Sequence, residues 1–175
     1  DELPQSASGR TIMTTEPKFV PKEAAEIRLS EDVKVRVRLI DCVGYMVEGA
    51  SGHAEGGEER QVKTPWFDHE IPFTKAAGIG TRKVIHDHAT IGIVITTDGS
   101  ITDIPQENYR DATEKTIREL QSIGKPFVVL VNSKKPFGDE AKQAALECEQ
   151  QYGVCAIPVN CEQLKEEDIT RIMEA

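Results

Sequence analysis

V-K-V-R-V-R-L-I-D-C-V-G-Y, residues Val33–Tyr45, is the stretch that decides the fold. Apolar residues alternate here with lysine and arginine, which is the period-two pattern of a strand that buries one face. The strand ends in Asp41, and Gly44 follows three residues later. P-loop nucleotide hydrolases use an acidic residue at a strand end, followed by Asp-x-x-Gly, to hold magnesium and to sense a γ-phosphate.

This pattern predicts two roles in a nucleotide site. Asp41 would hold Mg²⁺ through water, and the Gly44 amide would approach the γ-phosphate because glycine has no Cβ in the way. The alternative is that Asp41 only begins a turn, so the neighbouring segments must decide between the two interpretations.

The segment before this strand completes a hairpin. Ala25–Ser30 also alternates, and a short polar turn separates it from Val33, so residues 25–41 are predicted to form an antiparallel hairpin. Residues 1–24 show little periodicity and are predicted to form an extended, switch-like loop. Residues 43–72, rich in glycine and charge, are predicted to form a second irregular, switch-like loop.

Two threonines in the first loop are candidate catalytic residues. Thr14 and Thr15 lie in T-I-M-T-T-E, upstream of Asp-x-x-Gly at the separation that a switch loop requires. One of them could offer its hydroxyl to Mg²⁺ and position the attacking water. Threonine is also common in extended loops, so this motif alone leaves both interpretations open.

Residues 73–175 alternate strand and helix. This order indicates a parallel sheet with crossover helices, in which apolar runs such as Ile91–Thr96 are buried strands. The fold class is therefore predicted to be α/β: a three-layer, GTPase-like P-loop NTPase fold in one truncated domain, mostly parallel with one antiparallel hairpin. The other expected elements are helices at Phe73–His88, Asn108–Ile123, Asp139–Tyr152 and Glu166–Ala175, and strands at Phe127–Val131 and Val154–Val159.

A second motif follows the strand F-V-V-L-V. Asn132 and Ser133 stand there as candidate nucleotide-binding residues, at the place where GTPases carry N-K-x-D. The aspartate of that motif reads guanine, but its position here is Lys135. The sequence therefore predicts either adenine or no base reading, and a simple polar loop remains the alternative.

The Walker A loop, G-x-x-x-x-G-K-[ST], is absent from the sequence. We therefore expect the phosphate cradle and its strand to come from residues upstream of Asp1, and this chain alone to be inactive. In the expected fold that strand lies between the Val33 and Ile91 strands. The gap would be filled by other residues of the parent protein, by a neighbouring chain, or by the two strands closing up.

Composition excludes several classes of protein. The net charge of -9 argues against nucleic-acid binding, which needs a basic face. No apolar run approaches the roughly 20 residues of a membrane span, and no signal peptide opens the chain, so a cytoplasmic location is expected. The four cysteines form no C-x-x-C pair and are expected to be reduced thiols.

Several longer phrases carry a family resemblance: T-I-M-T-T-E-P-K-F-V-P, R-L-I-D-C-V-G-Y, V-I-T-T-D-G-S-I and V-N-S-x-x-P. With these, residues Asp1–Ala175 resemble the nucleotide-binding domain of the stage IV sporulation protein A family, after its Walker A loop. The family comprises spore-coat morphogenetic ATPases. In it, Thr14 and Thr15 match sensor threonines, and Asp41 matches the Walker B acidic residue.

The resemblance implies ATP and Mg²⁺ as cofactors and ATP hydrolysis that drives polymerisation into the basement layer of the spore coat. It also implies a mother-cell location at the forespore surface. The implied partners are further copies of the protein, other spore-coat proteins and, through regions absent here, a small amphipathic membrane-bound peptide. A non-catalytic assembly module and a GTPase remain the alternatives.

Overall fold

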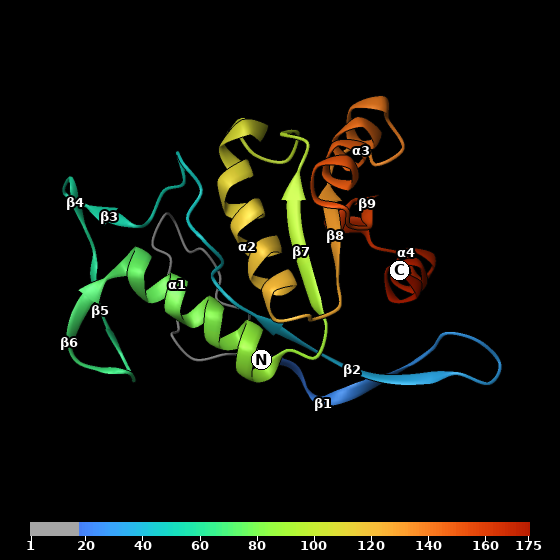
Figure 1. Cartoon of the computed structure of the whole chain (residues 1–175), viewed down its shortest axis with the longest axis horizontal. Coiled ribbons are helices and arrows are strands. Elements are labelled where there is room, and N and C mark those ends of the chain that lie inside the picture. Colours follow the sequence, from blue (N-terminus) through green and yellow to red (C-terminus); the bar gives the residue numbers. More distant parts are fainter. Residues whose placement is uncertain (1–17) are drawn as a thin grey trace. The chain divides into compact units, whose positions relative to one another are not determined.

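A computed structural model describes residues 18–175 of the chain, which forms two compact units (Figure 1). Of the described residues, the first unit comprises residues 18–25 and Val37–Ala89, and the second comprises Glu26–Arg36 and Thr90–Ala175.

The elements follow one another along the chain. The strands are β1 (Lys18–Arg28), β2 (Lys34–Asp41), β3 (Ala54–Glu55), β4 (Glu58–Glu59), β5 (Gln61–Thr64), β6 (Phe67–Pro72), β7 (Gly92–Thr97), β8 (Phe127–Asn132) and β9 (Ala156–Val159). The helices are α1 (Phe73–Lys83), which continues as the π-helix η1 (Val84–His88), α2 (Arg110–Ser122), α3 (Asp139–Tyr152) and α4 (Glu166–Glu174). Short 3₁₀ turns are η2 (Gln106–Tyr109) and η3 (Cys161–Gln163).

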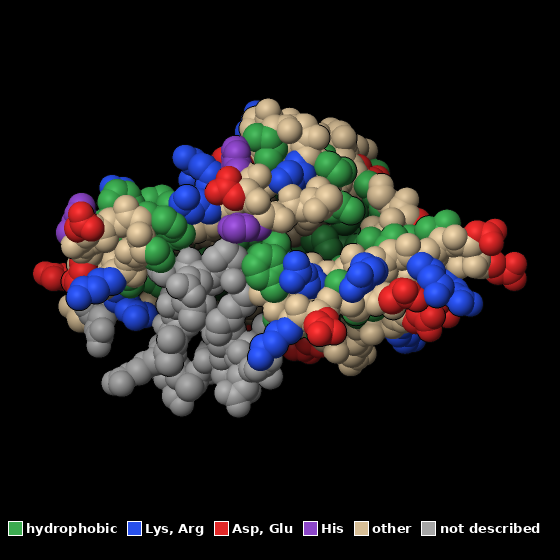
Figure 2. All heavy atoms as spheres, turned by 90° about the horizontal axis from the view of Figure 1, so that it is seen from below, with side chains coloured by type: hydrophobic (Ala, Val, Ile, Leu, Met, Phe, Trp, Pro, Cys, Tyr) green, Lys and Arg blue, Asp and Glu red, His purple; other side chains and the backbone are tan. Residues whose placement is uncertain are grey.

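The predicted hairpin is confirmed. Strands β1 and β2 form a two-stranded sheet, and the Leu29 amide donates to the Val33 carbonyl at 2.9 Å to close the turn. Strand β1 is longer than predicted and contains Pro21, which a two-stranded sheet tolerates at an edge. Acidic and basic side chains intermingle over this part of the surface (Figure 2). Lys34 of β2 pairs with Glu26 of β1, with 2.7 Å between Nζ and Oε1.

The prediction of an irregular loop over residues 43–72 is wrong for its second half. Strands β3 and β4 pair as one hairpin, and β5 and β6 pair as another. The first turn is Gly56-Gly57, in which both residues have positive φ, at 64° and 87°. Two successive residues of positive φ define the hairpin turn whose twist matches its strands. The second hairpin places Val62 opposite Ile71.

The predicted helix over Phe73–His88 is confirmed as α1 and η1. Aromatic rings pack beside its two internal glycines at ordinary contact distance. A Cβ at Gly78 would lie 3.7 Å from the Tyr45 ring, and one at Gly80 would lie 3.6 Å from the Trp66 ring. Packing of these rings therefore offsets the low helix propensity of glycine.

The second unit is built on a parallel sheet in the order β7-β8-β9, which confirms the predicted α/β class. Helices α2 and α3 lie on the face to which Thr96 and Val129 point, because the Thr113 hydroxyl of α2 donates to Thr96 at 3.0 Å. Helix α4 covers the other face. There its Ile172 packs with Val128, Leu130, Ile157 and Val159.

Strand β7 differs from its prediction. Ile93 and Ile95 lie on the α4 face, yet they are 42% and 59% exposed. The expectation of a strand buried on both sides is therefore wrong for one face, because α4 reaches β8 and β9. Within residues 18–175 β7 pairs with β8 alone, and β2 belongs to a separate sheet.

Glycines mark the C-terminal ends of α2 and α3, whereas no side-chain hydrogen bond caps their N-terminal ends. The N-cap of α2 is Tyr109 without a side-chain hydrogen bond, because η2 leads straight into the helix. The predicted stops at Gly124 and Gly153 are confirmed. Both have positive φ, 64° and 66°, which glycine adopts without strain.

Candidate functional site

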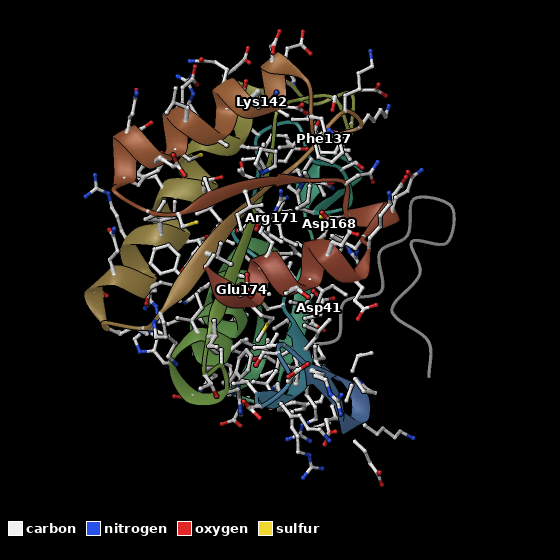
Figure 3. All side chains as sticks on the ribbon, turned by 90° about the vertical axis from the view of Figure 1, so that its right-hand side faces the viewer. Asp41, Phe137, Lys142, Asp168, Arg171 and Glu174 are labelled. Atoms are coloured by element: carbon white, nitrogen blue, oxygen red, sulfur yellow. The ribbon has the colours of Figure 1, made fainter. Side chains whose placement is uncertain are left out.

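The first candidate site is the turn that follows β2, in the first unit. Strand β2 ends at Asp41, whose side chain is exposed (Figure 3). Gly44 has a φ of 79°, and no heavy atom lies within 4 Å of the position that a Cβ would take. The backbone conformation therefore favours glycine here, and the space beside its Cα is open.

Cys42, which follows Asp41, is partly buried. Burial raises the pKa of the Cys42 thiol, although a hydrogen bond with the Gly44 backbone opposes this shift. The buried Thr81 hydroxyl of α1 faces the Cys42 sulfur and likewise opposes this shift in pKa. The thiol is therefore neutral at physiological pH, and the charge that this turn presents is the carboxylate of Asp41.

A magnesium ion is compatible with Asp41. Mg²⁺ keeps several waters and is usually bound through one or two carboxylates together with substrate phosphates, so a dense cage of protein ligands is not needed. The part of the chain that the structure describes holds no group of three metal-ligating side chains. An exposed carboxylate at a strand end fits the water-mediated role predicted for Asp41.

The two candidate threonines, Thr14 and Thr15, lie outside the described residues. Their roles in positioning water and Mg²⁺ therefore stay predictions.

A separate candidate site is the loop after β8, in the second unit. The Asn132 side-chain oxygen accepts a hydrogen bond from the Cys161 amide at 2.9 Å, which joins this loop to the one after β9. Ser133 is fully buried, and its hydroxyl accepts from the Lys135 amide at 2.9 Å. The Ser133 side chain thus holds the loop, and nucleotide contact by either residue stays a prediction.

Sequence reasoning missed Asp98, which follows β7. One carboxylate oxygen accepts hydrogen bonds from the Ser100 amide at 3.0 Å and from the Ser100 hydroxyl at 2.6 Å. The Ser100 hydroxyl in turn accepts from the Lys134 amide at 3.0 Å. The sequence signal was present: Asp-Gly-Ser directly after an apolar strand places polar groups at the carboxyl edge of a parallel sheet, where ligands bind.

Hydrogen bonding keeps Asp98 ionised. Burial raises the pKa of this carboxyl group, but hydrogen bonds from the Ser100 and Ser133 side chains and from backbone amides outweigh it, so the pKa lies below its usual value.

Phe137 lies in the turn between this loop and α3, and its side chain is 76% exposed (Figure 3). A separate pocket lies among β7, α2 and α3, lined in part by Arg110, Glu147 and Cys148. Burial raises the pKa of the Cys148 thiol, and acidic neighbours add to the shift. None of the predicted site residues lines this pocket.

Comparison with known proteins identifies the family of this chain. Residues 1–175 match the family model described as "Stage IV sporulation protein A, ATPase domain". The chain belongs to this family. Stage IV sporulation protein A of Clostridioides difficile (strain 630) is 51% identical over 175 residues, which cover 100% of this chain and 36% of that protein.

Two further relatives agree. The proteins of the same name from Bacillus anthracis and Bacillus subtilis (strain 168) are 47% and 46% identical over 173 residues, 99% of this chain in each case. The chain spans 35% of the length of each. No solved structure matches. The resemblance seen in the sequence is thus confirmed: the chain is a sporulation-protein segment that matches an ATPase domain.

Among the residues that the structure describes, no helix has the length and apolar character needed to cross a membrane.

Proposed function

We propose that this chain forms part of the ATP-hydrolysing site of a longer sporulation protein, in which water attacks the γ-phosphate. The observation that carries the proposal is the turn Asp41–Gly44, with an exposed carboxylate at the end of β2 and a glycine of positive φ three residues later, in a chain that matches an ATPase-domain family. Phosphoryl transfer needs positioning and charge stabilisation, and these residues can supply both.

Each residue has a role in this proposal. Bound Mg²⁺ would neutralise charge on the phosphates, and Asp41 would hold it through a water molecule. The Gly44 amide donates to the γ-phosphate. Thr14 or Thr15 orients the attacking water. The lysine and the backbone amides that cradle the phosphates come from a Walker A segment outside these residues, so the 175-residue chain alone is inactive.

ATP is proposed rather than GTP because of the loop after β8. A guanine reader needs an acceptor for the base's N–H groups, whereas the Lys135 ammonium offers donors alone. Lys135 is exposed. Adenine lacks the guanine N1–H and N2 donors, so it loses nothing at this position. The Asn132 side-chain oxygen accepts a hydrogen bond from the Cys161 amide, so the side-chain NH2 group of Asn132 is the group that would face the base.

Hydrolysis would drive self-assembly of the parent protein into the basement layer of the spore coat. The family's name places it in sporulation, which supports this part of the proposal. The proposed partners are other copies of the protein, other spore-coat proteins and a membrane-bound amphipathic peptide that contacts regions outside this chain. The site of assembly would be the mother-cell side of the forespore.

Equilibrium binding of ATP and GTP, with Mg²⁺, to the full-length protein and to residues 1–175 tests the proposal. We expect the full-length protein to bind ATP more tightly than GTP, and the 175-residue chain to bind neither at micromolar concentration. Tighter binding of GTP would favour a GTPase. Tight binding by the short chain would refute the need for a separate phosphate cradle, and absence of binding by the full-length protein would favour a non-catalytic assembly module.

A further inference from the structure

Three loops at the carboxyl edge of the sheet β7-β8-β9 are tied together by polar groups. The Lys134 amide donates to the Ser100 hydroxyl across 34 positions of sequence, which joins the loop after β8 to the loop after β7. On its other side, the loop after β8 is joined to the loop after β9 by the bond from the Cys161 amide to Asn132. The loop after β8, residues 132–135, is the middle loop of the three, and hydrogen bonds tie it to both neighbouring loops.

Asp98 is the charged end of this network. Its oxygen accepts both hydrogen bonds from Ser100, so it fixes the direction in which the Ser100 hydroxyl donates. That hydroxyl must then present a lone pair to its next partner, and the partner is the Lys134 amide. The carboxylate therefore acts on the middle loop through one intervening hydroxyl.

Ser133 gives a second route to the same loop. The side chain is 0% exposed, so its hydroxyl must be satisfied within the protein. It accepts from the Lys135 amide, and its own proton is directed to the Asp98 carboxylate, whose pKa it helps to lower. Two successive amides of the middle loop are therefore set by groups that converge on Asp98.

The network also explains the glycine between Asp98 and Ser100. Gly99 has a φ of 87°, and its amide donates to the Thr97 hydroxyl at 3.0 Å. A Cβ at Gly99 would lie 3.3 Å from the Gln106 backbone nitrogen. The turn that aims Asp98 and Ser100 at the middle loop is therefore built on a conformation that favours glycine.

We propose that Asp98 is a positioning residue for nucleotide binding: through Ser100 and Ser133, it holds the loop Asn132–Lys135 in the shape in which that loop meets the base of ATP. This inference rests on the proposed function, because it takes that loop as the base-facing one. Asp98 does not contact the nucleotide. Its loss should weaken ATP binding and leave the hydrolytic step, which depends on Asp41 and the threonines, largely intact.

The test uses the full-length protein with Asp98→Ala and Ser100→Ala, at a temperature well below unfolding. Loss of a hydrogen bond to a charged group typically changes an equilibrium by about tenfold or more, so we expect KM for ATP to rise about tenfold while kcat changes less than about twofold. Amide exchange at Lys134 should be faster in both variants. Ser100→Thr keeps the hydroxyl and should restore both values.

Ile117→Val provides a control for stability. Ile117 is fully buried on α2 and takes no part in the network, so its variant should lower stability with no change in KM. Unchanged KM and unchanged Lys134 exchange in Asp98→Ala and Ser100→Ala would overturn this inference alone. Failure of the wild-type full-length protein to bind ATP would overturn the proposed function and this inference together.

Discussion

Gly92, the first residue of β7, offers a quantitative test of how α2 packs on the sheet. A Cβ at this position would lie 2.9 Å from one terminal methyl carbon of Leu120 and 3.0 Å from the other, and 3.0 Å from the Phe127 Cβ on β8. Leu120 is only 2% exposed, so its side chain has little space into which to turn. Gly92→Ala must therefore move α2 or strain the pairing of β7 with β8.

The magnitude follows from two opposing effects. Overpacking a tight core costs about 1–3 kcal/mol. Replacing glycine by alanine returns about 0.4–1 kcal/mol, because the unfolded chain loses conformational freedom. We therefore expect Gly92→Ala to lower the free energy of unfolding by about 1–2 kcal/mol, measured by urea denaturation. Gly80→Ala on α1 is the matched control: its Cβ has ordinary contact distance, 3.6 Å from Trp66, and it should be neutral or stabilising.

A double-mutant cycle makes the reasoning refutable. Leu120→Ala alone should cost about 2–5 kcal/mol because it leaves a cavity. In that background the new Cβ at position 92 occupies vacated space, so Gly92→Ala should cost little and the two changes should be coupled by about 1–2 kcal/mol. Equal costs in both backgrounds, or a neutral Gly92→Ala in the wild type, would refute the packing described for α2.

Two further predictions concern polar groups that hold each unit. Thr113→Val should destabilise the protein by about 1–3 kcal/mol in thermal or urea unfolding, because it leaves the buried Thr96 hydroxyl without its partner. The double variant with Thr96→Val should cost less than the sum of the single variants, and strict additivity would contradict the contact. Hydrogen bonds from Thr74, at the N-terminus of α1, lower the pKa of Glu59. A carboxyl group whose pKa is lower in the folded state stabilises the fold at pH values above its unfolded-state pKa. This contribution is lost as the pH falls through the folded-state pKa. The difference in unfolding free energy between wild type and Glu59→Gln should therefore shrink on acidification. A difference independent of pH would contradict the stabilising hydrogen bonds between Thr74 and the Glu59 carboxylate.

Local patterns in the sequence predicted the elements that depend on local chemistry. Alternation in V-K-V-R-V-R gave the hairpin, and the glycines at 124 and 153 gave the ends of α2 and α3. The hairpin β3–β4 was missed although Gly56-Gly57 is a strong turn signal, because its strands are two residues long and show no periodicity. The glycine pair alone is the sequence signal for this hairpin.

Other features depend on contacts that no local pattern reveals. The apolar run Ile91–Thr96 predicts a buried strand, but a sequence does not say which neighbour covers each face, and Ile93 and Ile95 are exposed. The network of Asp98 joins residues that are far apart in sequence, so no local pattern indicated it. The motif Asp41–Gly44 was found because strand and turn are contiguous.

The central claim is that Asp41 holds magnesium in an ATP-hydrolysing site, and the most direct test is the Mg²⁺ dependence of ATP hydrolysis by the full-length protein and its Asp41→Asn variant. Residues that orient a metal's ligands typically contribute 10–100-fold to metal affinity or activity, so we expect the variant to need about 10–100 times more Mg²⁺ or to lose activity by that factor. Asp41 is exposed, so the variant should remain folded, as circular dichroism will check. Hydrolysis with unchanged rate and unchanged Mg²⁺ requirement in a folded Asp41→Asn protein would contradict the account.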